Sequence, residues 1–491
     1  MSEVVRNTQK IPVGDGTTGG GSAAAAALTS SAAPAPSSSS TPSSTPSVRP
    51  AQGSRLDRWV DAYAARTRGM TASEIRALFA VASRPEVVSL AGGMPYLAAL
   101  PLDVVGDSLA RLVAEHGDVA LQYGSGQGEP GLRERILEVM APQQVTANRD
   151  DIVVTTGSQQ ALDLVTRIFV DPGDVVVAEA PSYVGALGVF RAYQADVVHV
   201  AMDDEGLIPE ALEETLTRLS REGRRVKLLY TVPNHHNPAG VTLAARRRPQ
   251  VVDIAQRHGV LVLEDDPYGL LGFDGDPLPS LQALNPEGVI YLGSFSKTFA
   301  PGFRVGWAVA PHAVREKLVL ASEAAILCPS NFSQLAVSTY LDSHDWRHQV
   351  TIFRNLYAER SKATLDALAD LMPRARWTVP RGGFYVWVTL PEGLDATAML
   401  PRAVTERVAY VPGTAFYADG QGRSNMRLSY CYPVPERIRE GVRRLAGVID
   451  AELEMLETFG PTASAASPAT PPSADRHGVS FPVSFPAPDL R

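Results

Sequence analysis

The strongest constraint on the fold is a regular alternation of short apolar runs and helical segments between residues 152 and 309. Helical patterns such as Ser158–Phe169 and Arg246–His258 lie between most of the runs. Strands that alternate with helices are typical of a mostly parallel sheet with helices on both faces. We therefore expect an α/β fold whose ligand lies beyond the carboxyl ends of the strands. The seven runs are 152–155, 175–178, 197–200, 227–230, 260–263, 289–292 and 305–309.

Composition excludes several classes of protein. The 491 residues carry a net charge of -8, so no nucleic-acid partner is expected. The chain has only two cysteines, which predicts no disulfide framework and fits a reducing cytosol. No apolar stretch reaches the roughly 18 residues that a membrane span needs. The sequence indicates a soluble cytoplasmic protein without membrane contact, and no metal site is expected.

Composition also divides the chain. Residues 1–53 and 458–491 are rich in small residues and proline, and we expect disordered tails there. Between them, 54–100 is expected to form an N-terminal arm and a segment of a small domain. Residues 101–345 are expected to form the large domain, and 346–457 a smaller α+β C-terminal domain.

The stretch from Gly293 to Arg304 follows the sixth apolar run. If the backbone stays extended, Ser294 and Ser296 point the same way, because side chains in a strand repeat every two residues. Two hydroxyls and the guanidinium of Arg304 suit a phosphate dianion. Lys297 can become an aldehyde-binding nucleophile if its proton is suppressed. The alternative is a serine-rich turn with two solvated cations.

Three other strand ends carry polar groups. Thr156–Gln160 opens a helix whose free N–H groups can bind an anion. Asn237 lies in a proline turn, and Glu264–Tyr268 contains adjacent carboxylates. Each alone could be a helix cap, a turn or a solvated acidic run. Their placement at one edge of one sheet favours a functional site.

Motifs distributed over residues 66–450 resemble those of fold-type I pyridoxal 5′-phosphate enzymes. The chain is most similar to the class I/II aminotransferases, in the 2-aminoadipate/kynurenine/aromatic amino acid branch. The motifs are SLAGGMP (89–95), QYGSGQG (122–128), TTGSQQALDL (155–164), EAPSYVGAL (179–187), PNHHNPAG (233–240), LEDDPYG (263–269), GSFSKTFAPGFRVGW (293–307), PRGGFYVW (380–387) and MRLSY (426–430).

The resemblance implies a role for each matching cofactor residue. Lys297 should hold pyridoxal 5′-phosphate as the internal aldimine and later move the substrate proton. Asp265 should pair with the pyridine nitrogen, with Asp266 as the other candidate. The remaining implied contacts are Asn237 and Tyr268 to the phenolic oxygen, Tyr183 over the ring, and Ser158, Gln159, Ser294, Ser296, Arg304 and the partner subunit's Tyr123 to the phosphate.

The resemblance also implies the substrate contacts and a homodimer with shared active sites. Arg427 should pair with the substrate carboxylate, and Gly93 should allow close approach of the backbone. Arg68 could meet a distal carboxylate, although it could equally be a solvated arginine on an exposed arm. The family's usual Asn-Pro-Thr/Ser-Gly appears here with Ala239, while Asn237, which would lie between cofactor and substrate, is kept.

The implied function is amino transfer between an L-amino acid and a 2-oxo acid such as 2-oxoglutarate. Two alternatives stay open. A MocR-like transcriptional regulator would need a DNA-binding head, which the first 53 residues do not suggest. Another chemistry on the same cofactor, such as a lyase or decarboxylase reaction, would use the same cofactor residues. The sequence leaves the amino donor open among aromatic, 2-aminoadipate-like and long aliphatic amino acids.

Overall fold

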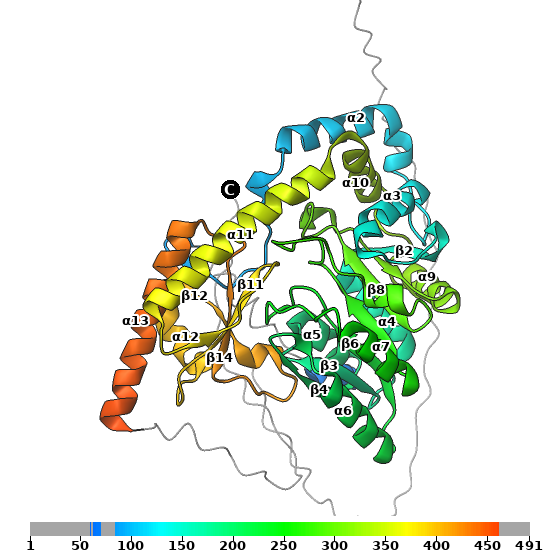
Figure 1. Ribbon diagram of the computed structural model, residues 1–491. Helices are drawn as coiled ribbons and strands as arrows, with labels where there is room; N and C mark the ends of the chain where they lie inside the picture. Colours follow the sequence, from blue (N-terminus) through cyan, green and yellow to red (C-terminus); the bar gives the residue numbers. More distant parts are fainter. Residues whose placement is uncertain (1–58, 60–61, 70–83, 461–491) are drawn as a thin grey trace, which may run out of the picture. The chain divides into compact units, whose positions relative to one another are not determined.

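The computed structural model describes residues 59, 62–69 and 84–460 (Figure 1). The described residues from Tyr63 onward belong to one compact unit. The helix expected over residues 71–82 and the N-terminal tail lie outside the described residues, as does most of the C-terminal tail. The first two residues of the predicted C-terminal tail, 458 and 459, belong to the last helix, α13 (Pro435–Phe459).

An eight-stranded sheet dominates the structure, and it confirms the predicted α/β fold. Seven strands correspond to the seven predicted runs, and the eighth, β5, is a two-residue strand too short to show periodicity. The order is β2-β9-β8-β7-β6-β3-β4-β5, parallel from β8 to β4, with β9 antiparallel to both neighbours. The strands are β2 (Ile152–Thr155), β3 (Val175–Ala180), β4 (Asp196–Asp203), β5 (Gly206–Leu207), β6 (Val226–Thr231), β7 (Leu261–Asp265), β8 (Val289–Ser294) and β9 (Gly306–Val309).

Helices cover both faces of this sheet. On β3, Val176 and Ala178 pack with one helical layer, while Val175 and Val177 pack with the other. Strands buried on both faces must be apolar at every position, which is why the runs lack polar alternation. The first layer contains α4 (Ser158–Phe169), α5 (Val184–Ala192) and α9 (His312–Ile326); the second contains α6 (Pro209–Arg221), α7 (Arg248–Arg257) and α8 (Leu281–Leu284).

A second, antiparallel sheet is built from the C-terminal part of the chain. Its order is β10-β11-β14-β13, and helices α11 and α13 pack against each other beside it (Figure 1). The early strand β1 pairs in parallel with β12, so residues 88–89 join this C-terminal part. The domain boundaries stay a prediction. The elements are β1 (Val88–Ser89), β10 (Arg376–Trp377), β11 (Tyr385–Thr389), β12 (Val408–Ala409), β13 (Val411–Pro412), β14 (Asn425–Ser429), α11 (Trp346–Leu371), α12 (Ala396–Thr405) and α13 (Pro435–Phe459).

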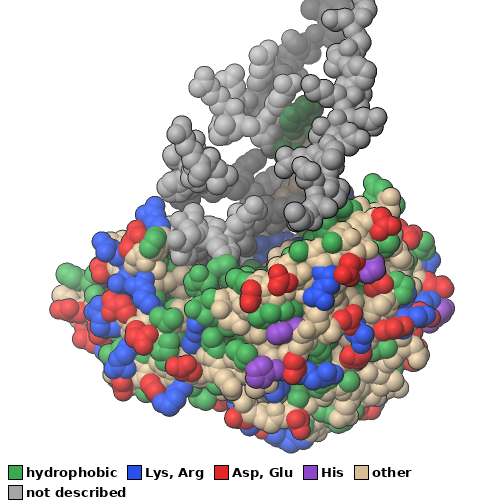
Figure 2. All heavy atoms as spheres, turned by 90° about the horizontal axis from the view of Figure 1, so that it is seen from above, with side chains coloured by type: hydrophobic (Ala, Val, Ile, Leu, Met, Phe, Trp, Pro, Cys, Tyr) green, Lys and Arg blue, Asp and Glu red, His purple; other side chains and the backbone are tan. Residues whose placement is uncertain are grey.

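The remaining long helices are α2 (Leu102–Ala120), α3 (Pro130–Met140) and α10 (Asn331–Ser343), and α2 packs on α10. Glu129 caps α3 by accepting hydrogen bonds from two backbone N–H groups of its first turn. On the face shown in Figure 2, acidic and basic side chains are interspersed. No described helix is long and apolar enough to cross a bilayer.

Candidate active site

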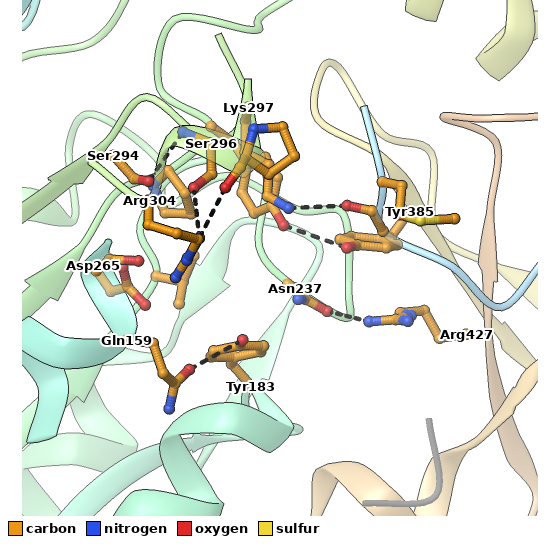
Figure 3. Close-up of a pocket in the computed structure, with 17 residues that line it drawn as sticks. Gln159, Tyr183, Asn237, Asp265, Ser294, Ser296, Lys297, Arg304, Tyr385 and Arg427 are labelled. Carbon is orange, nitrogen blue, oxygen red and sulfur yellow. Dashed lines mark hydrogen bonds between the residues drawn. The ribbon is translucent and has the colours of Figure 1, made fainter. Parts of the chain in front are cut away.

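A pocket of about 260 Å³ opens where the carboxyl ends of β6, β7 and β8 meet the second sheet (Figure 3). All the predicted site residues except Tyr123 and Arg68 line it. The lining residues are Gly93, Met94, Ser158, Gln159, Tyr183, Val232, Asn237, Asp265, Pro267, Tyr268, Ser294, Ser296, Lys297, Pro301, Arg304, Tyr385 and Arg427.

Lys297 projects into this pocket from the turn that follows β8. Its ammonium donates a hydrogen bond to the carbonyl oxygen of Gly93 at 2.9 Å. Burial is the main cause that lowers the pKa of Lys297 to about 8. A lysine with this pKa is partly neutral near pH 7 to 8, which is the condition for attack on an aldehyde.

Asp265 ends β7 and is almost fully buried at the floor of the pocket. Its Oδ2 accepts a hydrogen bond from the hydroxyl of Tyr230 at 2.9 Å, while Oδ1 is buried without a partner among the described residues. Burial raises the pKa of Asp265 to about 7. A positively charged ring N–H would supply the missing donor and favour the carboxylate form, so this residue fits the pyridine nitrogen of pyridoxal phosphate.

Asp266, the other candidate for that role, does not line the pocket. Its carboxylate accepts hydrogen bonds from Gln143 and from the hydroxyl of Tyr291. Successive residues on an extended strand point to opposite sides, so Asp265 and Asp266 cannot both face the cofactor site. The geometry therefore favours Asp265.

An anion cradle lies at the start of α4, beside Arg304. The guanidinium of Arg304 donates to Ser296 Oγ at 3.4 Å and to the carbonyl of Thr156 at 3.3 Å. A Cβ on Gly157 would lie 2.5 Å from Arg304 Nη2, and the φ of +76° at this position favours glycine. The first N–H groups of α4, together with these side chains, fit a phosphate.

Tyr183 lies beside the anion cradle and lines the pocket. Its hydroxyl donates a hydrogen bond to Gln159 Oε1 at 3.3 Å. Burial raises the pKa of Tyr183 to about 12, so the phenol stays neutral at physiological pH. Both side chains therefore sit beside the cradle, and Tyr183 presents its ring to the cavity (Figure 3).

Asn237 is held in its turn by buried groups behind the pocket. His236 Nδ1 accepts a hydrogen bond from the N–H of Ala239 at 3.2 Å, and its Nε2 lies 3.2 Å from Glu179 Oε2. His235 has a positive φ of 48° and packs against Gly382. Neither histidine lines the pocket, so neither is placed to meet a substrate.

Arg427 projects from β14 and is 2% exposed. One guanidinium nitrogen donates to Asn237 Oδ1 at 2.8 Å, and another donates to the carbonyl of Ala91 at 2.7 Å. The guanidinium lies over two rings, with its carbon 4.3 Å from the Tyr385 centroid and 5.1 Å from that of Phe416. Its Nε is buried without a partner among the described residues. A buried guanidinium without a carboxylate partner suits a substrate carboxylate.

Sequence reasoning missed two tyrosines of the site. Tyr385 lies within the motif PRGGFYVW, but nothing in the sequence shows that β11 lies beside β14. Tyr230 ends the fourth apolar run, and its contact with Asp265 depends on the neighbouring position of β6 and β7. Both tyrosines carry a hydroxyl at the end of a strand, which is a sequence signal for a site residue. The order of the strands is needed to predict which residues they contact.

Two predicted residues are not among the described residues that line the pocket, and the side chain of Arg68 lies outside the described part of the chain. Tyr123 is 77% exposed in the loop between α2 and α3. Arg68 lies in the short 3₁₀ helix η2 (Ala65–Gly69), which packs against α5. Helix α5 begins directly after the pocket residue Tyr183.

Comparison with known proteins places this geometry in a family. The model of "Aminotransferase class I and II" matches residues 85–445. Aromatic-amino-acid aminotransferase 1 of Thermococcus litoralis is 42% identical, over 80% of this chain and 95% of that protein. The 2-aminoadipate transaminase of Thermus thermophilus is 38% identical, over 81% of this chain and 99% of that protein.

Solved structures agree with the sequence relatives. The crystal structure of Pyrococcus horikoshii kynurenine aminotransferase, determined in complex with PMP, superimposes with a TM-score of 0.78 and 40% identity. It covers 82% of this chain and 100% of that one. An HTH-type transcriptional regulator of Bacillus subtilis also aligns, at a lower identity of 29% over 79% of each chain.

Proposed function

Because the chain belongs to the class I and II aminotransferase family, we infer that the pocket around Lys297 is its active site. The protein is a pyridoxal 5′-phosphate-dependent aminotransferase that moves an amino group between an amino acid and a 2-oxo acid. The observation that carries the site assignment is a partly neutral lysine in one pocket with an unsatisfied carboxylate oxygen and a buried arginine.

The residues present fit the cofactor. When bound, pyridoxal phosphate supplies an electron sink for the carbanion formed at the substrate Cα. Asp265 would keep the ring nitrogen protonated, because its buried carboxylate attracts the positive charge. Asn237 and Tyr268 would hold the phenolic oxygen. Ser158, Gln159, Ser294, Ser296 and Arg304 would hold the phosphate.

Lys297 would hold the cofactor covalently and then act on the substrate proton. Once its amine is released, Nζ would take the proton from the substrate Cα and deliver it to the cofactor C4′. A base works best when its pKa lies near the working pH, and the pKa of Lys297 is lowered to about 8.

Arg427 would bind the α-carboxylate of every substrate. The rest of the lining is largely apolar and includes Met94, Val232 and Pro301. The relatives in the comparison are named for aromatic amino acids and 2-aminoadipate. We propose aromatic or long aliphatic amino donors, with 2-aminoadipate as a further donor and 2-oxoglutarate as amino acceptor.

A panel assay tests this proposal. The purified enzyme with cofactor is incubated with 2-oxoglutarate and one amino donor, and the 2-oxo acid and glutamate are measured together. Equal yields of both products from phenylalanine, tyrosine, leucine or 2-aminoadipate are expected. Glutamate formed only from aspartate or alanine would overturn the proposed substrate class. Ammonia or carbon dioxide in place of glutamate would favour a lyase or a decarboxylase.

Arg68 is proposed as the residue that meets a distal carboxylate. The same pocket must accept glutamate, with its charged end, and donors whose side chains are apolar. An arginine on a segment that can move pairs with the acid and leaves the site for an apolar donor, so that no buried charge stays unpaired. The support is the packing of η2, which contains Arg68, against α5, the helix that follows Tyr183.

We propose that the active unit is a homodimer in which Tyr123 reaches the partner's phosphate site. Several apolar side chains are exposed around the Tyr123 loop, among them Leu121 at 72% and Leu327 at 58%. Asn331 on α10 donates to the carbonyl of Val119, which holds this loop near the end of α9. Apolar side chains gathered on one surface are typical of a protein interface.

Complementation tests the shared site. Mixing a Lys297→Ala chain with a Tyr123→Ala chain, each of low activity alone, should restore activity, because a heterodimer contains one intact site. A monomer at assay concentration with full activity would overturn the dimer proposal. A chain that carries both substitutions, Lys297→Ala and Tyr123→Ala, should stay inactive, because its dimer contains no intact site.

A further inference from the structure

Tyr385 contacts both the residue proposed to hold the cofactor oxygen and the residue proposed to hold the substrate carboxylate. The Tyr268 hydroxyl donates a hydrogen bond to the Tyr385 hydroxyl at 3.3 Å (Figure 3). The guanidinium carbon of Arg427 lies 4.3 Å from the centre of the Tyr385 ring. One buried side chain therefore connects the two halves of the site.

The register of the second sheet fixes this placement. Trp387 on β11 pairs with Arg427, and Tyr385 pairs with Ser429. Paired residues share a face of the sheet, so Tyr385 and Arg427 are diagonal neighbours on the same face. A Cβ at position 93 would lie 2.2 Å from Tyr385 Oη, so Gly93 leaves the only room for the phenol on that side.

We propose that Tyr385 is a positioning residue with two separable functions. Its hydroxyl orients the hydroxyl of Tyr268 toward the cofactor's phenolic oxygen, and its ring holds the guanidinium of Arg427. The inference rests on the roles proposed above for Tyr268 and Arg427, and the experiment below separates its failure from theirs.

The hydroxyl function follows from donor counting. A phenol has one proton to donate and two lone pairs that accept. When Tyr268 gives its proton to the cofactor oxygen, its contact with Tyr385 survives only if Tyr385 becomes the donor. Among the described residues, the Tyr385 hydroxyl forms its hydrogen bond with Tyr268. Donors in a chain polarise one another, so Tyr385 strengthens the donation from Tyr268.

The hydroxyl of Tyr385 should affect the charge on the cofactor's phenolic oxygen. A weaker donor at the phenolic oxygen leaves more negative charge on that atom. Negative charge nearby favours the protonated form of the nitrogen that joins Lys297 to the cofactor, so its pKa rises. Removing the Tyr385 hydroxyl should therefore raise this pKa in the same direction as removing the Tyr268 hydroxyl, but by less.

The ring function follows from the burial of Arg427. A guanidinium over the face of an aromatic ring is attracted by the ring quadrupole, most strongly where water is excluded. The guanidinium of Arg427 contacts the rings of both Tyr385 and Phe416. If one ring is removed, binding of the substrate carboxylate must also order the side chain of Arg427. The entropy lost in this ordering weakens substrate binding and raises KM.

Two substitutions separate the functions. Tyr385→Phe should raise the spectroscopic pKa of the lysine-bound cofactor by roughly half a unit to one unit, with KM unchanged. Tyr385→Leu should show the same titration shift and also a KM increase of roughly tenfold for both substrates. Phe416→Leu, the matched ring control, should raise KM without shifting the titration. Tyr410→Phe removes a buried hydroxyl that donates a hydrogen bond to the carbonyl oxygen of Ala396, so it should change neither quantity.

Each outcome decides the proposal. An unshifted titration in Tyr385→Phe, together with a shift in Tyr268→Phe, would overturn the hydroxyl function while leaving the proposed site intact. No shift in either variant would refute the role of Tyr268 as well. A KM increase in Tyr385→Phe as large as that in Tyr385→Leu would overturn the ring function. Thermal melting of each variant checks that the chain is folded.

Discussion

Arg427 and Asn237 are joined by a hydrogen bond of 2.8 Å between a guanidinium nitrogen and the side-chain oxygen. Arg427 comes from β14 in the second sheet, while Asn237 follows β6 in the large sheet. The residue proposed for the substrate carboxylate is thus held by a residue proposed for the cofactor. Substrate binding and cofactor electronics are therefore expected to be coupled through this pair.

Substitution of Arg427 should act on substrate binding. Arg427→Lys keeps the charge but loses the two-pronged geometry, so KM should rise by roughly 100-fold for donor and acceptor alike. Arg423→Ala, which removes an exposed ion pair with Asp395 just before β14, is the matched control and should leave KM unchanged. Steady-state kinetics with both substrates measure this. Loss of affinity for only one substrate would contradict a carboxylate site common to both.

Substitution of Asp265 should separate cofactor binding from turnover. Asp265→Asn still accepts a hydrogen bond from Tyr230 but cannot keep the ring nitrogen positive. We expect cofactor to bind and kcat to fall by roughly 100- to 1000-fold. Asp266→Asn should keep most of the rate, because that side chain faces Gln143 and lies outside the pocket. The reverse order of damage would assign the ring nitrogen to Asp266.

Asp265 should make the cofactor-free enzyme less stable relative to the Asp265→Asn variant as pH rises. Burial raises the pKa of Asp265 from 3.8 to about 7, so between these values the folded state binds a proton that the unfolded chain has released. By linkage, the contribution of Asp265 to the free energy of unfolding falls as pH rises from about 4 to about 7. Asp265→Asn has no carboxylate to titrate, so its free energy of unfolding should exceed that of the wild type by at least about 1 kcal/mol at pH 7. Denaturant unfolding of both proteins at pH 4.5 and 7 measures the difference; a constant difference would contradict the argument.

Substitution of Arg68 should change specificity rather than activity in general. Arg68→Ala is expected to raise KM for glutamate and 2-aminoadipate far more than KM for phenylalanine or leucine. Arg66→Ala, in the same short helix η2, is the control and should not discriminate between these donors. If Arg68→Ala raises KM for acidic and apolar donors to the same extent, Arg68 does not bind the side chain of the substrate.

The seven predicted strands could be found because each contains a short apolar run, and most of these runs are buried, as in β2, β3 and β8. The two-residue strand β5 could not, because two residues show no periodicity. Lys297, Asp265 and Asn237 could be found because each follows its own strand at the carboxyl edge. Tyr385 and the support that Glu179 gives His236 depend on strand order and on three-dimensional packing, which a single sequence does not reveal.

The central claim is that Lys297 carries the cofactor, and reductive trapping tests it most directly. The holoenzyme is reduced with borohydride, digested and mapped by mass spectrometry. We predict one modified peptide, with the cofactor on Lys297, and its loss in Lys297→Ala together with the lysine-bound absorption band and turnover. A modified peptide at any other lysine, or normal turnover by Lys297→Ala, would contradict the account.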